Sequence, residues 1–127
     1  MTWTLRITEN QIESITDVGQ LRRRLSAIHE DAMAEPAFVM LTAPDGACLA
    51  VGLGRELSAL SYTAPGGWPA KHVVGDEAVK GLIDYKFFGH FSEIPAREAI
   101  PVEQAMEAAV EFFVSGRLSE GLEWEDD

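Results

Sequence analysis

The first third of the chain alternates between the periodicity of a strand and that of a helix. Residues 3–7, "WTLRI", alternate apolar and polar side chains, which is typical of a half-buried strand. Residues 14–36 predict an amphipathic helix, with Ser14 or Thr16 as its N-cap and Pro36 at its exit. Its apolar stripe recurs at alternating spacings of three and four: Val18, Leu21, Leu25, Ile28 and Ala32.

Two apolar runs, 37–42 and 47–53, form the clearest hairpin of the sequence. Pro44 and Gly46 lie between them and supply the fixed and positive φ angles of a tight turn. Both runs are almost wholly apolar, so we expect central strands covered on both faces. A third strand is expected at 57–63.

The second half begins with a loop at 64–71, because its prolines and glycines break regular structure. Alternating side chains predict a strand at 82–88, and a short strand returns over 90–95. A second helix is expected over 101–115, ending at Gly116. Its apolar stripe is Val102, Ala105, Met106, Ala109, Val110 and Phe113.

This order of elements predicts an α+β fold: a mainly antiparallel sheet of about five to seven strands with two packed amphipathic helices. The chain has 127 residues, so we expect one domain over residues 1–127. Hydrophobic residues make up 46% and charged residues 24%, as in an ordinary globular protein.

The charge is strongly acidic, with 21 acidic and 10 basic residues and a net charge of −11. Phosphate backbones repel such a surface, so we expect no direct binding of nucleic acid. A cationic partner is favoured instead, because complementary charge speeds encounter. The alternative is that the charge only keeps the protein in solution.

No residues form a convincing catalytic, cofactor or metal site. The three histidines, His29, His72 and His90, lack the spacing of zinc ligands, and Cys48 lies in a predicted buried strand. We therefore expect a binding domain that is not an enzyme. The single cysteine, the lack of a signal-peptide pattern and the lack of an apolar run of about 20 residues predict a cytoplasmic protein with no membrane contact.

The acids concentrate toward the C-terminus. Residues 93–127 hold ten acids and two arginines, a net charge of −8. Glu103, Glu107 and Glu111 recur every four residues, and each like-charge pair disfavours a helix by roughly 0.2–0.5 kcal/mol. Either a cationic partner offsets this repulsion, or the charge is tolerated. The arginines at 22–24 predict a solvated helix face paired with nearby acids.

The last residues, "RLSEGLEWEDD", include large apolar side chains that we do not expect to be exposed to solvent. We interpret Leu118, Leu122 and Trp124 as a packed strap that returns to the sheet and leaves the final acids displayed. The competing interpretation makes Trp124 an exposed anchor for a partner. Trp68, in a loop without a periodic apolar face, is the stronger candidate for such an anchor.

With these elements placed, the chain resembles the first-numbered Imm family of bacterial immunity proteins from polymorphic toxin systems. The resemblance covers nearly the whole length and is carried by Trp3, the 38–54 hairpin, "LSALSY" and residues 85–124. The residues of the last stretch that fall in the family's order are Gly89, Glu93, Ile94, Pro95, Ile100, Pro101, Ala105, Phe113, Gly116 and Trp124.

The resemblance implies a cytoplasmic antitoxin without catalytic activity, whose partner is the C-terminal domain of a secreted toxin. Members are similar to partners of deaminase toxins, including cytidine deaminases that act on cytosine in DNA, and such toxins need a cationic groove for nucleic acid. An acidic protein could cover that groove. We expect partner contacts at Trp68, Asp76, Glu77, Glu103, Glu107, Glu111 and Glu123. The alternative function is a small-molecule-binding or regulatory domain with a pocket lined by Trp68, Tyr62 and Tyr85.

Overall fold

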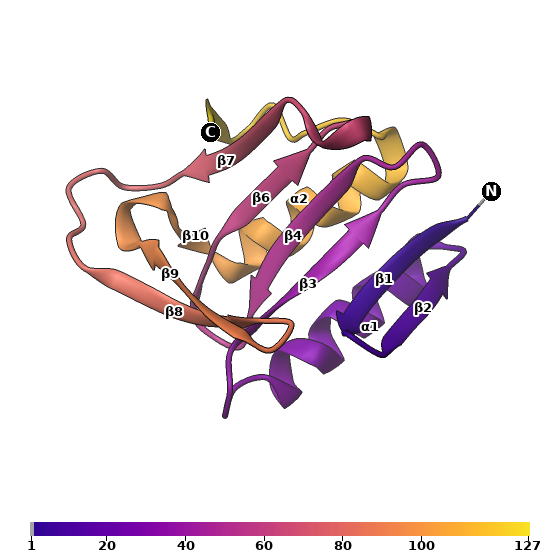
Figure 1. Cartoon of the computed structure of the whole chain (residues 1–127), viewed down its shortest axis with the longest axis horizontal. Helices are drawn as coiled ribbons and strands as arrows, with labels where there is room; N and C mark the ends of the chain where they lie inside the picture. Colours follow the sequence, from indigo (N-terminus) through magenta and orange to yellow (C-terminus); the bar gives the residue numbers. More distant parts are fainter. Residues whose placement is uncertain (1) are drawn as a thin grey trace.

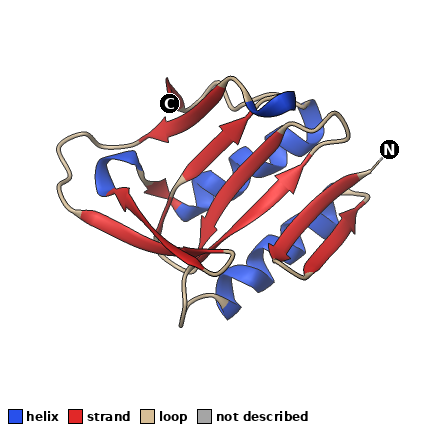
Figure 2. Cartoon of the chain, in the orientation of Figure 1, coloured by secondary structure: helices blue, strands red, loops and turns tan. Residues whose placement is uncertain are grey.

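The computed structural model describes residues 2–127 and shows two helices on one face of a large sheet (Figure 1, Figure 2). The helices are α1 (Val18–Asp31) and α2 (Val102–Ser115). The strands that follow one another across the sheet are β11 (Glu123–Asp126), β7 (Ala70–Val74), β6 (Leu60–Thr63), β4 (Cys48–Leu53), β3 (Ala37–Thr42), β1 (Trp3–Thr8) and β2 (Gln11–Ile15).

All the pairings along this path are antiparallel. A hairpin of β8 (Leu82–Phe87) and β9 (His90–Pro95) branches from it, because Lys86 of β8 pairs in parallel with Ala37 of β3. A separate two-stranded sheet joins β5 (Leu57–Ser58) to β10 (Ile100–Pro101). Two short 3-10 turns complete the described chain, η1 (Pro65–Gly67) and η2 (Ala96–Glu98).

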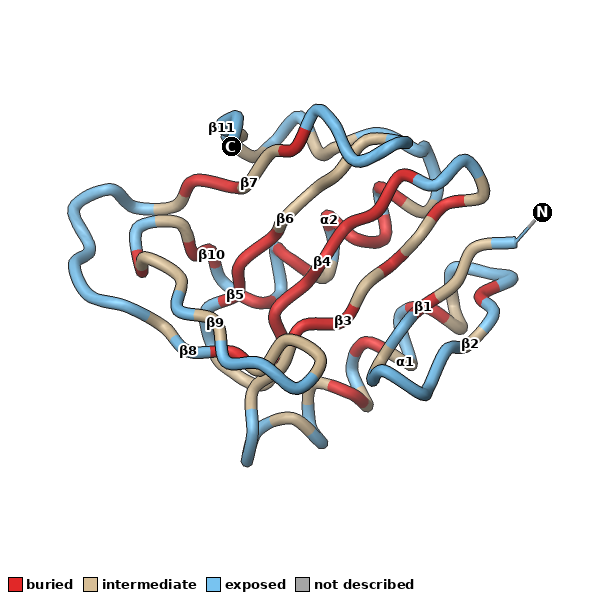
Figure 3. Tube along the Cα trace, viewed as in Figure 1, coloured by how far each residue is buried: buried red, intermediate tan, exposed pale blue. Residues whose placement is uncertain are grey.

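The hairpin predicted at 37–53 is confirmed and forms the centre of the fold. Every residue of β4 is buried (Figure 3). The reason is that Leu49, Val51 and Leu53 belong to the core shared with α1 and α2, whereas Ala50 packs with the β8–β9 hairpin on the opposite face. A central strand covered on both faces needs apolar residues at every position.

The helix predicted over 14–36 is present but shorter at both ends, since it starts at Val18 and ends at Asp31, before the exit expected at Pro36. Its N-cap is Asp17, whose side chain accepts a hydrogen bond from the Gln20 backbone N–H at 2.8 Å, so the expectation of Ser14 or Thr16 was wrong. Residues 11–15 instead form β2, which pairs with β1. Glu13 and Ile15 face the helices while their neighbours face solvent. The strand therefore alternates as expected, but its polar composition hides the alternation of apolar residues.

The second helix and its end at Gly116 are confirmed, but the helix starts one residue later than predicted. Pro101 is the N-cap, and Gly116 ends the helix in a left-handed conformation with φ of 73°. Its buried stripe differs from the predicted one at two positions: Ala108 and Phe112 are buried in place of Met106 and Phe113, which are half-buried. The ring of Phe112 meets Trp3 of β1 at 5.1 Å and Tyr62 of β6 at 6.0 Å, centroid to centroid.

The C-terminal strap is also confirmed. Residues 123–126 form β11, which pairs antiparallel with β7, with Trp124 opposite Val73. The half-buried Trp124 packs on the helix-side core, and its indole N–H donates to the Ser119 carbonyl at 3.0 Å. The alternative of an exposed Trp124 anchor is therefore wrong, and the acids around it lie at the surface.

The α+β class with two helices on a mainly antiparallel sheet is confirmed, but the number of strands is larger than five to seven. Over residues 2–127 there are eleven strands. The additional strands are short or polar, and each depends on a partner strand for its hydrogen bonds: β2, β11 and the two-residue β5 and β10. Their local sequences carry only a weak period of two.

Tyr85 anchors the β8–β9 hairpin on the sheet. Its ring lies 4.9 Å from that of Phe38, and its hydroxyl donates to the Leu57 carbonyl. A side chain on Gly52 of β4 would come within 2.8 Å of the Tyr85 ring, which explains the glycine in this central strand. Burial raises the pKa of Tyr85 to about 12.

This pKa predicts a loss of stability at alkaline pH. An unfolded tyrosine releases its proton near pH 10, whereas the folded one keeps it until about pH 12, so stability is complete below pH 10 and declines between these values. Tyr85→Phe should flatten this decline, and at neutral pH it should cost about 1 kcal/mol for the lost hydrogen bond. Urea unfolding across this pH range measures both. An unchanged pH slope in the variant would contradict the assignment.

Candidate partner-binding surface

Three of the predicted contact residues line one groove. Glu103, Glu107 and Glu111 of α2 form one side of a groove of about 440 Å³. The chain after the helix forms the other side, with Ser119, Gly121 and Leu122. The four-residue spacing places the carboxylates on one ridge, and the C-terminal strap closes the groove beside them. We call this groove the acidic groove.

The middle carboxylate of the ridge has a partner within the protein. Arg22 of α1 forms a two-pronged ion pair with Glu107, with 3.2 Å between Nη2 and Oε1. The hydrogen bond from Arg22 lowers the pKa of Glu107, and the carboxylate raises that of Arg22. The repulsion along the ridge is therefore relieved internally at its centre, without an external partner.

The other two carboxylates of the ridge differ from Glu107. Glu103 and Glu111 are exposed and have no cationic partner among residues 2–127. They leave the acidic groove with a net charge of −2, since Arg22 balances Glu107. These two glutamates are the members of the ridge available to a cation from outside.

The predicted pairing of the arginine triplet with acids is confirmed for Arg22 and Arg24. Arg24 holds Glu13 of β2 with 2.6 Å between Nε and Oε1, and this hydrogen bond lowers the pKa of Glu13. Both acids are remote in sequence rather than on the same helix. The third member, Arg23, is exposed and lacks a carboxylate within 4.0 Å in the described chain.

Glu123, Asp76 and Glu77 lie near one end of β7. Glu123 pairs with Val74 at the end of β7, and Asp76 and Glu77 are exposed in the loop that follows. Leu122, the neighbour of Glu123, lines the acidic groove. Side chains alternate along β11, so Glu123 faces away from Trp124 and from α2, and these three acids lie apart from the acidic groove.

Trp68 is separate from these acids. It is 68% exposed and precedes the opposite end of β7, beyond Ala70. The ends of a five-residue strand are roughly 13 Å apart. A large partner could touch both ends of β7, but Trp68 forms no common site with Asp76 and Glu77.

The structure adds a second acidic cluster that the spacing of residues did not single out. His72 of β7 has Asp127 Oδ1 at 2.6 Å from Nδ1, and Glu98 and Glu125 at 3.5 and 3.7 Å from Nε2. Lys71 beside it pairs with Asp126 at 2.6 Å. The pairing of β11 with β7 brings Glu125 and Asp127 to His72, and η2 contributes Glu98, so the spacing along the sequence does not predict this cluster.

The pocket expected from Trp68, Tyr62 and Tyr85 does not exist. Tyr62 packs against Phe112 on the helix side of the sheet, whereas Tyr85 packs against Phe38 on the hairpin side. Trp68 lies in the loop before β7. The sheet thus separates the two tyrosines, and this form of the alternative function was wrong.

The expected burial of Cys48 is confirmed, and burial raises the pKa of its thiol, with the Thr42 hydroxyl at 3.5 Å. Residues 2–127 bring no three side chains of His, Cys, Asp or Glu into an arrangement that could hold a metal ion. Neither described helix has the length and apolar character needed to span a membrane.

A comparison with models of protein families finds one family that matches this chain. A family model described as "Immunity protein Imm1" matches residues 8–126, almost the entire chain. A search among curated proteins found no match. The matched region includes both helices, the acidic groove and the C-terminal strap.

Proposed function

The chain belongs to the Imm1 family of immunity proteins, and on this premise we propose that it neutralises a secreted toxin domain by covering its active site. We propose further that this toxin is a basic, deaminase-like domain acting on nucleic acid, and that the two proteins meet in the cytoplasm. The chain would act by binding alone, with no chemistry of its own.

The distribution of charge supports this mechanism. A deaminase that acts on nucleic acid needs a cationic surface for its polyanionic substrate. The chain offers two exposed groups of acids: Glu103 and Glu111 in the acidic groove, and Glu123, Asp76 and Glu77 near one end of β7. The proposal rests on the observation that these acids have no cationic partner among residues 2–127.

Inhibition of purified toxin tests the proposed function. The toxin domain encoded beside this chain should deaminate a single-stranded oligonucleotide, and one equivalent of the chain should abolish this activity. More of the charge-reversed double variant Glu103→Lys/Glu111→Lys should be needed for the same inhibition, whereas the matched control Glu30→Lys/Glu93→Lys should inhibit nearly as well as the wild type. A complex that forms but keeps full deaminase activity would contradict active-site covering.

Replacement of Arg22 tests whether the acids of the acidic groove determine the rate of association with the toxin. Arg22→Ala releases Glu107 from its internal partner and makes the acidic groove more negative. A cationic toxin should then associate roughly twofold faster at low salt. The melting temperature should stay unchanged, because exposed ion pairs contribute little to stability.

Arg23→Ala is the control for this prediction. It removes the same charge from the same helix but frees no carboxylate of the groove. Stopped-flow association kinetics compare the two variants. Equal acceleration by both would show that only total charge matters and not the groove.

A further inference from the structure

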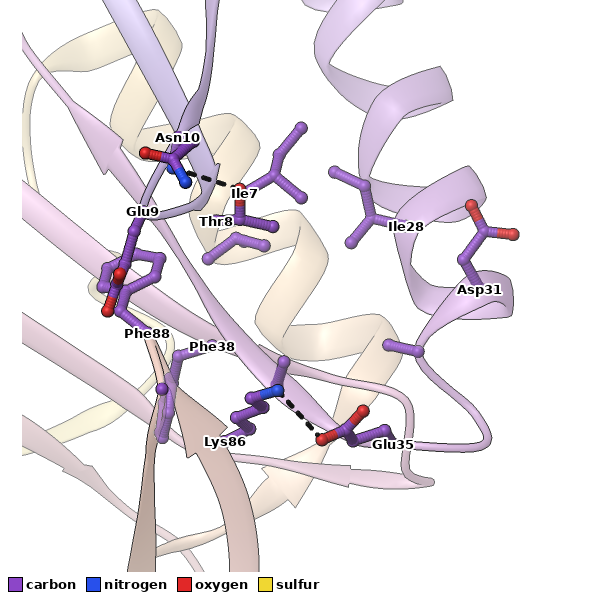
Figure 4. A pocket seen from close by; sticks show the side chains of 14 residues that line it. Ile7, Thr8, Glu9, Asn10, Ile28, Asp31, Glu35, Phe38, Lys86 and Phe88 are labelled. Atoms are coloured by element: carbon purple, nitrogen blue, oxygen red, sulfur yellow. Dashed lines mark hydrogen bonds and ion pairs between the residues drawn. The ribbon is translucent and has the colours of Figure 1, made fainter.

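A second cavity lies where four segments meet (Figure 4). The turn between β1 and β2, the end of α1, the start of β3 and the turn between β8 and β9 enclose about 430 Å³. This volume falls in the range of sites that hold a small ligand or a side chain. We call it the α1-end pocket.

The floor of the α1-end pocket is apolar. Ile28, Phe38 and Val39 line it and are buried, and the half-buried Ile7 continues the apolar surface from β1. An apolar floor favours the hydrocarbon part of a ligand. It offers nothing to a small, fully hydrated ion.

The rim is acidic. Glu9, Asp31 and Glu35 stand around the opening, and only Glu35 has a cation from the lining, Lys86 at 3.1 Å. Figure 4 shows Glu9 and Asp31 on opposite sides of the opening. Neither has an ion-pair partner in the described residues, so the lining carries a net charge of −2.

The end of α1 adds to this negative potential. The helix ends at Asp31 and its C-cap is Ala32, and both residues line the pocket. The unsatisfied carbonyls of a helix C-terminus carry partial negative charge and attract cations. Charge and dipole therefore favour the same kind of ligand.

The turn between β8 and β9 holds an aromatic ring at the pocket in an unusual conformation. Phe88 has φ of 47° and Gly89 has φ of 92°, the signs required by the tight hairpin turn in which asparagine followed by glycine is favoured. A bulky side chain at positive φ is uncommon and costs stability. The ring already attracts one guanidinium, that of Arg6 of β1, at 5.7 Å from its centroid.

We propose that the α1-end pocket receives an arginine side chain from the cationic surface of the toxin. This inference rests on the proposed function and adds a second anchor to the acidic groove. The hydrocarbon stem would lie on the apolar floor, and the guanidinium would bind Glu9 beside the Phe88 ring, while Asp31 adds negative charge from the opposite side of the opening. Arginine fits better than lysine because its planar head pairs with carboxylates in two-pronged fashion and stacks on aromatic rings.

Two variants of this chain test the pocket in binding to the purified toxin domain. Glu9→Gln/Asp31→Asn removes both unpaired charges without changing side-chain size, and it should weaken affinity about tenfold. Phe88→Asn places the favoured residue in the turn, so it should weaken affinity several-fold while the melting temperature stays equal or rises. The control Glu56→Gln/Glu93→Gln removes two exposed charges outside the pocket and should change affinity less than about twofold.

A double-mutant cycle identifies the occupant. Each surface arginine of the toxin is changed to lysine and measured against wild type and Glu9→Gln/Asp31→Asn. For one of these arginines, the change to lysine should lower the affinity for the wild-type chain about tenfold. The same change should hardly alter the affinity for Glu9→Gln/Asp31→Asn. Normal binding by both pocket variants, or no coupled arginine, would overturn the inference.

Further outcomes separate the pocket from the proposed function. Wild-type affinity in the pocket variants, with binding still weakened by Glu103→Lys/Glu111→Lys, would overturn the pocket and leave the proposed function standing. Failure of the wild-type chain to bind the toxin would overturn both. A dimer of the free chain that Glu9→Gln/Asp31→Asn converts to monomer would assign the pocket to a second copy and would also overturn the inference.

Discussion

Replacing Phe112 with alanine should lower the free energy of unfolding by about 3–5 kcal/mol, the largest single effect we expect on stability. The ring is completely buried and contacts Trp3 and Tyr62 edge-on, so it joins α2 to both β1 and β6. Truncation removes the apolar contacts and leaves a cavity that a helix lying on a sheet cannot readily close. Domains of this size are stable by about 5–15 kcal/mol, so the variant would be close to unfolding.

Val114→Ala is the control for this prediction. It lies on the same helix, is 70% exposed and should change stability by less than about 0.5 kcal/mol. Urea titration followed by circular dichroism compares the two variants. A loss below about 1 kcal/mol for Phe112→Ala would show that α2 is not held at this point.

The double reversal Glu103→Lys/Glu111→Lys should slow association with the toxin about tenfold at low salt and make the rate less sensitive to salt. These two carboxylates lack an internal partner, so they can steer a cationic surface toward the acidic groove. Glu107 is left unchanged because Arg22 already holds it. Dissociation should change less, since steering acts mainly on encounter.

The matched control reverses Glu30 and Glu93, two exposed acids outside the acidic groove. Glu30→Lys/Glu93→Lys makes the same change in net charge, so it should slow association much less. Surface plasmon resonance at several salt concentrations separates the two rates. Identical behaviour of both double variants would mean that the groove itself is not the contact.

The elements with strong periodicity were predictable from sequence. The central hairpin, α2 with its Pro101 and Gly116 boundaries, and the Trp124 strap each have a local signal: an apolar run, a capping residue or a large ring. For these elements local preference and tertiary packing agree. The family resemblance was confirmed over nearly the whole chain.

The strands that sequence analysis missed depend on partners far along the chain. β2 contains glutamine, glutamate and serine, and it is a strand because β1 lies beside it and Arg24 pairs with Glu13. The 57–63 run was predicted as one strand but is divided at Ala59 between two sheets. The pattern of residues within one segment carries no information on which strands pair with each other.

Only the part of the candidate site that lies within one helix could be predicted from the sequence. Helical spacing placed Glu103, Glu107 and Glu111 on one ridge, and the structure brings them into one groove. Spacing could not show that Arg22, 85 residues away, occupies the middle carboxylate. It also could not find the α1-end pocket, whose lining comes from four separate segments.

Displacement of a labelled single-stranded oligonucleotide from a catalytically inactive toxin domain tests active-site covering most directly. Fluorescence anisotropy follows the oligonucleotide while this chain is added. We predict complete release of the oligonucleotide at one equivalent, because the protein and the nucleic acid compete for one cationic cleft. A stable assembly of toxin, oligonucleotide and chain together would contradict that mechanism.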